Sequence, residues 1–215
     1  MGTGPYMPDE EYTKLTAFPD YRNYASLPVD TVYLKEIKET EQMITAFENS
    51  EIDLVTNDPT SAYNLGYGSA NEVRYYPTTN MQYLGFNSNS RYFSSTLCRK
   101  AMTYVVDREH IVTDFLNGAA SAATLPMNPT FALYNDAYSD IISYSVKKSE
   151  TAFDEAQVQD YDDDGKREIM ITGIPVEIEI DFIVCSDSPA KVQAAQSIAD
   201  NLTALGITVN LRQLS

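Results

Sequence analysis

The sequence predicts an α/β or α+β fold, because strand, helix and strand patterns follow one another with short turns between them. In residues 176–184, apolar side chains alternate with carboxylates, which is typical of a strand with one wet face. Ser188 and Pro189 then begin a helix with a continuous apolar face, and Gly206 ends it before a second alternating stretch at 207–211. A strand, a helix and a strand joined this closely predict a parallel crossover.

The first third of the chain predicts a second unit of this kind. Extended segments are expected at 11–17 and 29–37, with turn residues between them. Thr40 is placed to cap a helix whose apolar residues share one face, and the apolar run at 52–55 indicates a strand after it. Strand, helix and strand in so short a stretch favour a βαβ-like unit whose helix lies on a sheet.

The stretch that follows predicts one more helix and two more strands. Asp58 and Pro59 suit the start of a helix, because Asp caps well and Pro is tolerated at the first helical position. A glycine-rich break follows it, and strands are then expected at 72–76 and 81–87.

Two further helices and a long loop occupy the middle of the chain. Ser94 or Ser95 is expected to cap the first helix, and Asp107 the second, which Gly118 closes in the left-handed conformation that glycine favours. Residues 119–144 are rich in Ala, Pro, Asn and Tyr and predict an irregular segment on the surface. A loop of that length in a compact domain is usually functional or held by its own side chains.

Composition excludes several classes of function. The 215 residues allow one large domain or two small ones. With 31 acidic and 15 basic side chains, the net charge of −16 argues against binding to nucleic acid or to an anionic membrane surface. No apolar run reaches the ~20 residues that span a bilayer, and residues 1–8 lack the pattern of a secretory signal.

The reactive side chains predict neither an enzyme nor a cofactor. Cys98 and Cys185 are too few for a four-ligand zinc site, and two buried thiols are favoured over a bridge between them. His110 is the single histidine, and no G-x-S-x-G motif accompanies it. Three carboxylates on one strand could serve acid–base chemistry, but the solvent face of a half-buried strand is the favoured interpretation of Glu177, Glu179 and Asp181.

An acidic run offers one candidate for a metal site. Asp160, Asp162 and Asp164, followed by Gly165, have the D-x-D-x-D-G spacing of a calcium loop. The twelfth position of such a loop should be Glu, and here it is Ile171. A solvated acidic turn without metal is therefore favoured. The alternative is a calcium-stabilised extracellular domain that binds a carbohydrate or other ligand through the acidic loop at 160–165.

A series of short strings then points to a known family. In chain order they are GTGPY at 2–6, FPDY at 18–21, NSEIDL at 49–54, YLGFN at 83–87, LCRKAMTYVVDRE at 97–109, GAA at 118–120 with Pro126 and Pro129, and LGITV at 205–209. Together they resemble the family 5 extracellular solute-binding proteins, which are the oligopeptide-, dipeptide- and nickel-binding receptors of ABC importers. The chain departs from the family pattern at Arg22, where Trp is usual, and across 147–159.

The resemblance implies an α/β fold of the two-lobed, type II periplasmic-binding-protein kind, with a mixed sheet and flanking helices. Family members are more than twice as long, so the resemblance implies that the chain is a central fragment. Residues 1–79 would form part of the first lobe, residues 80–85 a crossover between the lobes, and residues 86–215 an incomplete second lobe.

The resemblance also implies a function. A monomeric receptor, lipid-anchored at the cell surface or free in the periplasm, would capture a small solute between its lobes and deliver it to the permease of an ABC transporter. A peptide is the solute we expect. Ligand contacts would come from the loop after the IDL string, from the crossover strand and from the turn after residue 184, that is from Thr56, Asn57, Asp58, Tyr83, Gly85, Cys185, Ser186, Asp187 and Ser188. The alternative for each is a hinge or turn residue without ligand contact.

Overall fold

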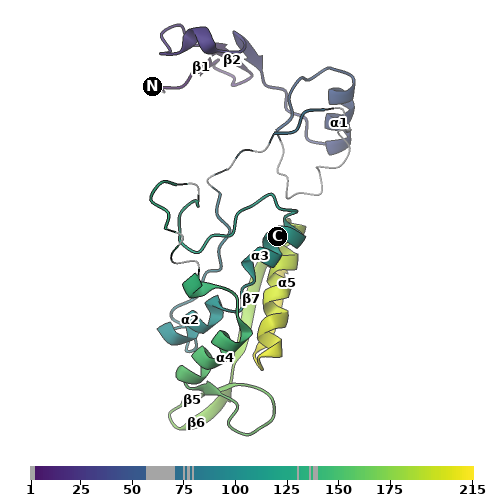
Figure 1. Ribbon diagram of the computed structural model, residues 1–215. Coiled ribbons are helices and arrows are strands. Elements are labelled where there is room, and N and C mark those ends of the chain that lie inside the picture. Colours follow the sequence, from purple (N-terminus) through teal and green to yellow (C-terminus); the bar gives the residue numbers. More distant parts are fainter. Residues whose placement is uncertain are drawn as a thin grey trace. The chain divides into compact units, whose positions relative to one another are not determined.

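A computed structural model describes residues 3–56, 71–74, 76, 78, 80–129, 131–135, 137 and 140–215 of the chain (Figure 1). They divide into two compact units, the first holding residues 3–56 and 71 and the second the described residues from 72 onward. The helix start expected at Asp58 and Pro59 and the glycine-rich break after it lie outside the described residues.

The first unit contains a small antiparallel sheet of three strands. Strand β1 (Tyr6–Pro8) pairs with β2 (Lys14–Ala17), and β2 pairs with β3 (Thr31–Tyr33). Asp9 shapes the first hairpin, because its carboxylate accepts hydrogen bonds from the backbone amides of Thr13 and Lys14. A single turn of 3-10 helix, Tyr24–Ser26, lies between β2 and β3. The strands expected at 11–17 and 29–37 therefore form, but they are shorter than predicted.

Helix α1 (Thr40–Glu48) follows the sheet and confirms the predicted helix. Its N-cap is Glu39, so the expected capping role of Thr40 is wrong. The strand expected at 52–55 is also wrong, since these residues pair with no strand in the described part of the chain, and Leu54 is 79% exposed. A short apolar run does not by itself distinguish a strand from an irregular segment. The predicted βαβ-like unit is thus an antiparallel sheet followed by a helix.

The second unit is built on a parallel crossover. Strand β7 (Glu179–Cys185) leads into α5 (Pro189–Ala204), which returns the chain to β8 (Thr208–Leu214) beside β7. Figure 1 shows α5 lying along this strand pair. Alternate residues of the strands pack against the core on the helix side, as with Ile180 and Val209, which are partners in the register. The predicted parallel crossover is confirmed.

The strand predicted over 176–184 is two strands in different sheets. Strand β6 (Ile174–Glu177) joins β5 (Glu168–Ile171) and β4 (Val158–Gln159) in an antiparallel sheet, whereas β7 belongs to the parallel pair. Ile178 lies between them and is 3% exposed. Its amide donates to the Arg167 carbonyl and its carbonyl accepts from the Thr208 amide. The alternation of buried and exposed residues continues through the switch, so hydrophobic periodicity does not reveal it.

The predicted helix caps are largely confirmed. Helix α2 (Thr96–Thr103) begins after Ser95, whose side chain accepts from the Cys98 amide. Asp107 likewise caps α3 (Arg108–His110), which continues as a π-helix over Ile111–Phe115. Gly118 follows with a φ of +73°, the left-handed conformation expected of it.

Helix α4 (Val146–Glu155) was not predicted. It lies in the segment that departs from the family pattern, and it packs against α2, where the buried Ser149 hydroxyl donates to the Ala101 carbonyl. The described residues of 119–144 are irregular, as expected, apart from the 3-10 turn Asp140–Ile142. The strands expected at 72–76 and 81–87 are wrong, because the described residues of both segments join no sheet in the described part of the chain.

The core of the second unit joins these helices to both of its sheets. The largest fully buried side chains are those of Phe153, Leu202, Ile207, Val105 and Val158. Cys98 belongs to this core, as predicted, but Cys185 is exposed, and both thiols are free. Burial raises the pKa of the Cys98 thiol. Among the described helices, none is long and apolar enough to cross a membrane.

We expect Gly206→Ala to destabilise the chain more than Gly118→Ala. Both glycines have positive φ, so Ala costs about 1 kcal/mol at either position. At Gly206 a Cβ would also lie 2.6 Å from the Gly165 carbonyl oxygen, whereas it meets nothing within 4 Å at Gly118. Urea unfolding should give a loss of about 3 kcal/mol for Gly206→Ala. Equal losses in the two variants would show that the close backbone approach has no energetic weight.

Candidate functional site

The turn between β7 and α5 brings four of the expected ligand-binding residues together. It lies at the carboxyl end of the parallel strands, the edge at which α/β proteins usually bind ligands. The Ser186 amide donates to the Leu214 carbonyl at 2.8 Å, which ties the turn to the end of β8. Cys185, Ser186 and Asp187 are exposed, and Ser188 is half-buried at the N-cap of α5.

This turn offers both donors and acceptors for hydrogen bonds. The Ser186 hydroxyl donates to the Asp187 carboxylate at 3.4 Å, a long contact that leaves the carboxylate largely to solvent. The Ser188 side chain makes no capping bond, so it accepts no hydrogen bond from the first-turn amides of α5. A helix N-terminus carries a partial positive charge. The arrangement suits a ligand with amide or other polar groups.

Tyr83 and Gly85 lie on the irregular segment 80–87. Tyr83 is 80% exposed, and a Cβ on Gly85 would lie 3.8 Å from the Tyr83 ring, so these two residues are neighbours. Within the described part of the chain, no hydrogen bond or ion pair connects either of them to the turn after β7. The structure thus places the two groups of expected ligand residues on separate segments.

The first unit holds the remaining expected residue that the structure describes. Thr56 is exposed, whereas Asn57 and Asp58 lie outside the described residues. The segment that leads to Thr56 borders an open hollow of about 420 Å³. The residues that line this hollow come from the end of α1, from the segment after α1 and from position 71. They are Phe47, Glu48, Ser50, Ile52, Asp53 and Asn71.

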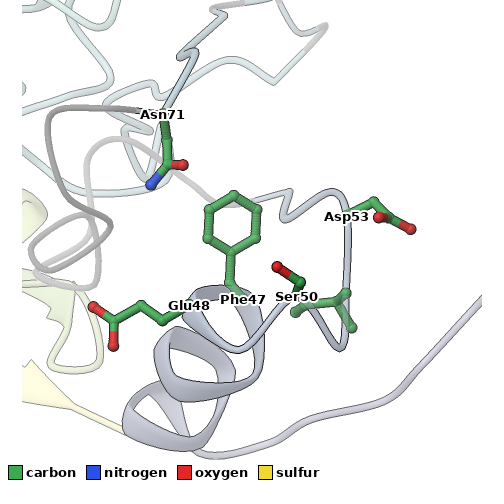
Figure 2. Close-up of a pocket in the computed structure, with 6 residues that line it drawn as sticks. Phe47, Glu48, Ser50, Asp53 and Asn71 are labelled. Carbon is green, nitrogen blue, oxygen red and sulfur yellow. The ribbon is translucent and has the colours of Figure 1, made fainter.

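Figure 2 shows the Phe47 ring in this hollow beneath the Asn71 amide, with the Glu48 and Asp53 carboxylates pointing outward on opposite sides. Phe47 is the one aromatic side chain among the described lining residues, which are otherwise mostly polar. Sequence reasoning missed this hollow, because its lining residues are brought together from positions 47 and 71 by folding and form no motif.

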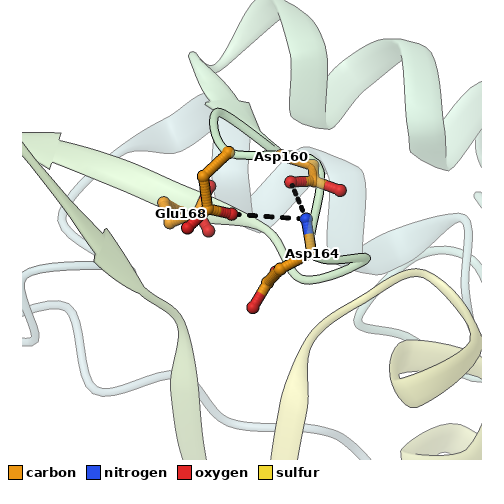
Figure 3. A group of neighbouring side chains, drawn as sticks. Asp160, Asp164 and Glu168 are labelled. Atoms are coloured by element: carbon orange, nitrogen blue, oxygen red, sulfur yellow. Dashed lines mark hydrogen bonds between the residues drawn. The ribbon is translucent and has the colours of Figure 1, made fainter.

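The acidic loop between β4 and β5 gathers four carboxylates. Ligand oxygens of Asp160, Asp162, Asp164 and Glu168 lie within 4.8 Å of one another (Figure 3). The Asp160 carboxylate accepts from the backbone amides of Asp164 and Gly165, at 3.1 and 2.8 Å. The loop thus has internal hydrogen bonds that hold its shape, while the oxygen ligands are of the kind that calcium prefers.

Glu168 is the member of this cluster that sequence reasoning missed. It is 4% exposed, and its carboxylate accepts from the Tyr161 amide at 2.8 Å. The calcium-loop pattern directs attention to position twelve, Ile171, whereas Glu168 occupies position nine. Pairing of Glu168 with Gln159 in the sheet folds it back to the loop. A Glu at position nine of a loop that begins D-x-D-x-D-G is the signal that would have found it.

The two cations that follow the loop are each engaged with a carboxylate outside the cluster. Lys166 Nζ lies 2.8 Å from a Glu177 carboxylate oxygen, and this hydrogen bond raises the pKa of Lys166. Arg167 Nη1 lies 2.7 Å from Asp154 Oδ1 and also donates to the Val158 carbonyl, while its Nε donates to the Leu205 carbonyl. Arg167 therefore ties the loop to α4, β4 and the end of α5.

The groups considered for acid–base chemistry have structural partners. Asn210 donates to the carboxylates of Glu179 and Asp181, and Arg212 pairs with Asp181, so these side chains form a polar face of the β7–β8 pair. The predicted solvent face is confirmed for Glu179 and Asp181 on β7, whereas Glu177 is exposed on β6, in a different sheet. His110 Nδ1 lies 3.2 Å from Asp114 Oδ2, an ion-pair geometry one helical turn apart.

Comparison with known proteins decides the family. All 215 residues match the model of the Bacterial extracellular solute-binding proteins, family 5 Middle. The chain belongs to this family. The family resemblance indicated by the short sequence strings is thereby confirmed.

Curated relatives of the chain are solute-binding proteins. The oligopeptide-binding protein AppA of Bacillus subtilis is 28% identical over 172 residues, which are 77% of this chain and 31% of AppA. The heme-binding protein A of Haemophilus influenzae is 26% identical over 135 residues, 61% of this chain and 22% of that protein. The chain thus spans less than a third of the length of these relatives.

Solved structures confirm the fold class. AppA in complex with a nonapeptide aligns with a TM-score of 0.60 and 22% identity, over 99% of this chain and 42% of AppA. NikA of Brucella suis in complex with Fe(III)-EDTA aligns with a TM-score of 0.69 and 19% identity, over 100% of this chain and 43% of NikA. The mixed α/β arrangement described above is therefore that of part of a two-lobed periplasmic binding protein.

We expect Arg167→Met to destabilise the second unit by about 2–4 kcal/mol, because it leaves the Leu205 and Val158 carbonyls without this donor and removes a partly buried ion pair. Arg212→Met is the matched control, since Arg212 is 59% exposed and its pair with Asp181 should contribute less than about 1 kcal/mol. Urea unfolding of both variants measures the difference. Similar losses would mean that Arg167 does not connect the elements.

We expect Asp160→Ala to lower the free energy of unfolding by about 1–2 kcal/mol in the presence of a chelator, because two loop amides lose their acceptor. Asp163→Asn removes the same charge from the loop and suits the positive φ of 60° at that position. It should change the free energy by less than about 0.5 kcal/mol. Thermal unfolding of both variants in EDTA tests this, and an unchanged Asp160→Ala would contradict it.

Proposed function

We propose that the chain is the central part of an extracellular receptor that captures a small solute and delivers it to the permease of an ABC importer. The observation that carries this proposal is the match of all 215 residues to the family of extracellular solute-binding proteins. The two-lobed fold of the aligned structures supports it. The receptor is monomeric, and it is either lipid-anchored at the cell surface or free in the periplasm.

A peptide is the solute that the relatives favour. AppA is named as an oligopeptide-binding protein and was solved with a nonapeptide, whereas other relatives are named for heme or were solved with a metal chelate. A peptide suits the polar turn after β7, because its backbone presents amide donors and carbonyl acceptors at regular spacing. An extended peptide would pair its backbone with the receptor and leave its side chains in hydrated pockets.

Capture would proceed by closure of two lobes on the solute. Residues 1–79 belong to the first lobe, 80–85 cross between the lobes, and 86–215 belong to the second. Ligand contacts come from Thr56, Asn57, Asp58, Tyr83, Gly85 and the turn Cys185, Ser186, Asp187 and Ser188. A ligand that binds both lobes shifts the population toward the closed state, which the permease then recognises.

We expect Asp187→Ala, made in the full-length receptor, to weaken peptide binding about tenfold. The Asp187 carboxylate is exposed at the turn, and one charge-assisted hydrogen bond to a ligand amide or ammonium is worth about 1.5 kcal/mol or more. Asp200→Ala is the matched control, since Asp200 is an exposed residue of α5 that accepts from Gln196. Calorimetric titration with the peptides that co-purify with the receptor gives both affinities.

The outcomes separate the site from the function. Peptide binding that Asp187→Ala leaves unchanged would overturn the placement of the ligand at this turn but not the receptor. A receptor that binds no peptide yet retains heme or a metal chelate would overturn the solute class. Retention of no solute of any kind by the native receptor would contradict the proposed function itself.

The alternative function, a calcium-stabilised domain that binds its ligand through the acidic loop, makes a different prediction. Calcium that binds the four clustered carboxylates of the folded loop would stabilise the folded state, so calcium would raise the melting temperature. An increase that Asp162→Ala abolishes, together with ligand binding that requires calcium, would favour this alternative. Peptide binding that is equal in calcium and in EDTA supports the receptor.

A further inference from the structure

We draw no further inference here: the strongest candidate, the carboxylate cluster of Asp160, Asp162, Asp164 and Glu168 in the loop between β4 and β5, belongs to the site already described, and its buried member, Glu168, already accepts a hydrogen bond from the Tyr161 amide.

Discussion

The arrangement of the second unit depends on the contacts of Arg167 with the end of α5. The Arg167 amide donates to the Gly206 carbonyl, and its guanidinium reaches Leu205, Asp154 and Val158. One residue thereby joins the parallel crossover to the antiparallel sheet and to α4. This contact requires glycine at position 206, because the Gly165 carbonyl oxygen occupies the space that a Cβ of residue 206 would need. The acidic loop is held against the core by this same contact.

The parts of the fold that sequence predicts are those in which local signals agree. The crossover combines alternating strands, a proline at the helix start and a glycine at its end, and the structure confirms it. The switch between sheets at Ile178 is invisible, because alternation persists while the strand partner changes. The segments 52–55 and 81–87 have apolar residues at strand-like spacing but no partner strand in the described structure. Strand pairing depends on residues far apart in the chain, so a short stretch of sequence does not reveal it.

The candidate site divides in the same way. The resemblance indicates the turn after β7, and the structure places Ser186 and Asp187 at the carboxyl end of parallel strands, where ligands usually bind. The acidic run is plain in the sequence, but its fourth carboxylate, Glu168, joins through pairing of β5 with β4. The hollow beside Phe47 has no local signal, because folding brings Asn71 to it from far along the chain.

These 215 residues align with 42% of AppA and 43% of NikA, so the proposed receptor is expected to be longer than this chain. An immunoblot of source cells with an antibody against this chain measures the mass of the native protein and therefore tests the receptor interpretation most directly. The interpretation predicts a single band of more than twice 24.0 kDa in the membrane or secreted fraction. A band near 24.0 kDa would contradict it, because a chain of that size spans only 42–43% of the aligned two-lobed structures.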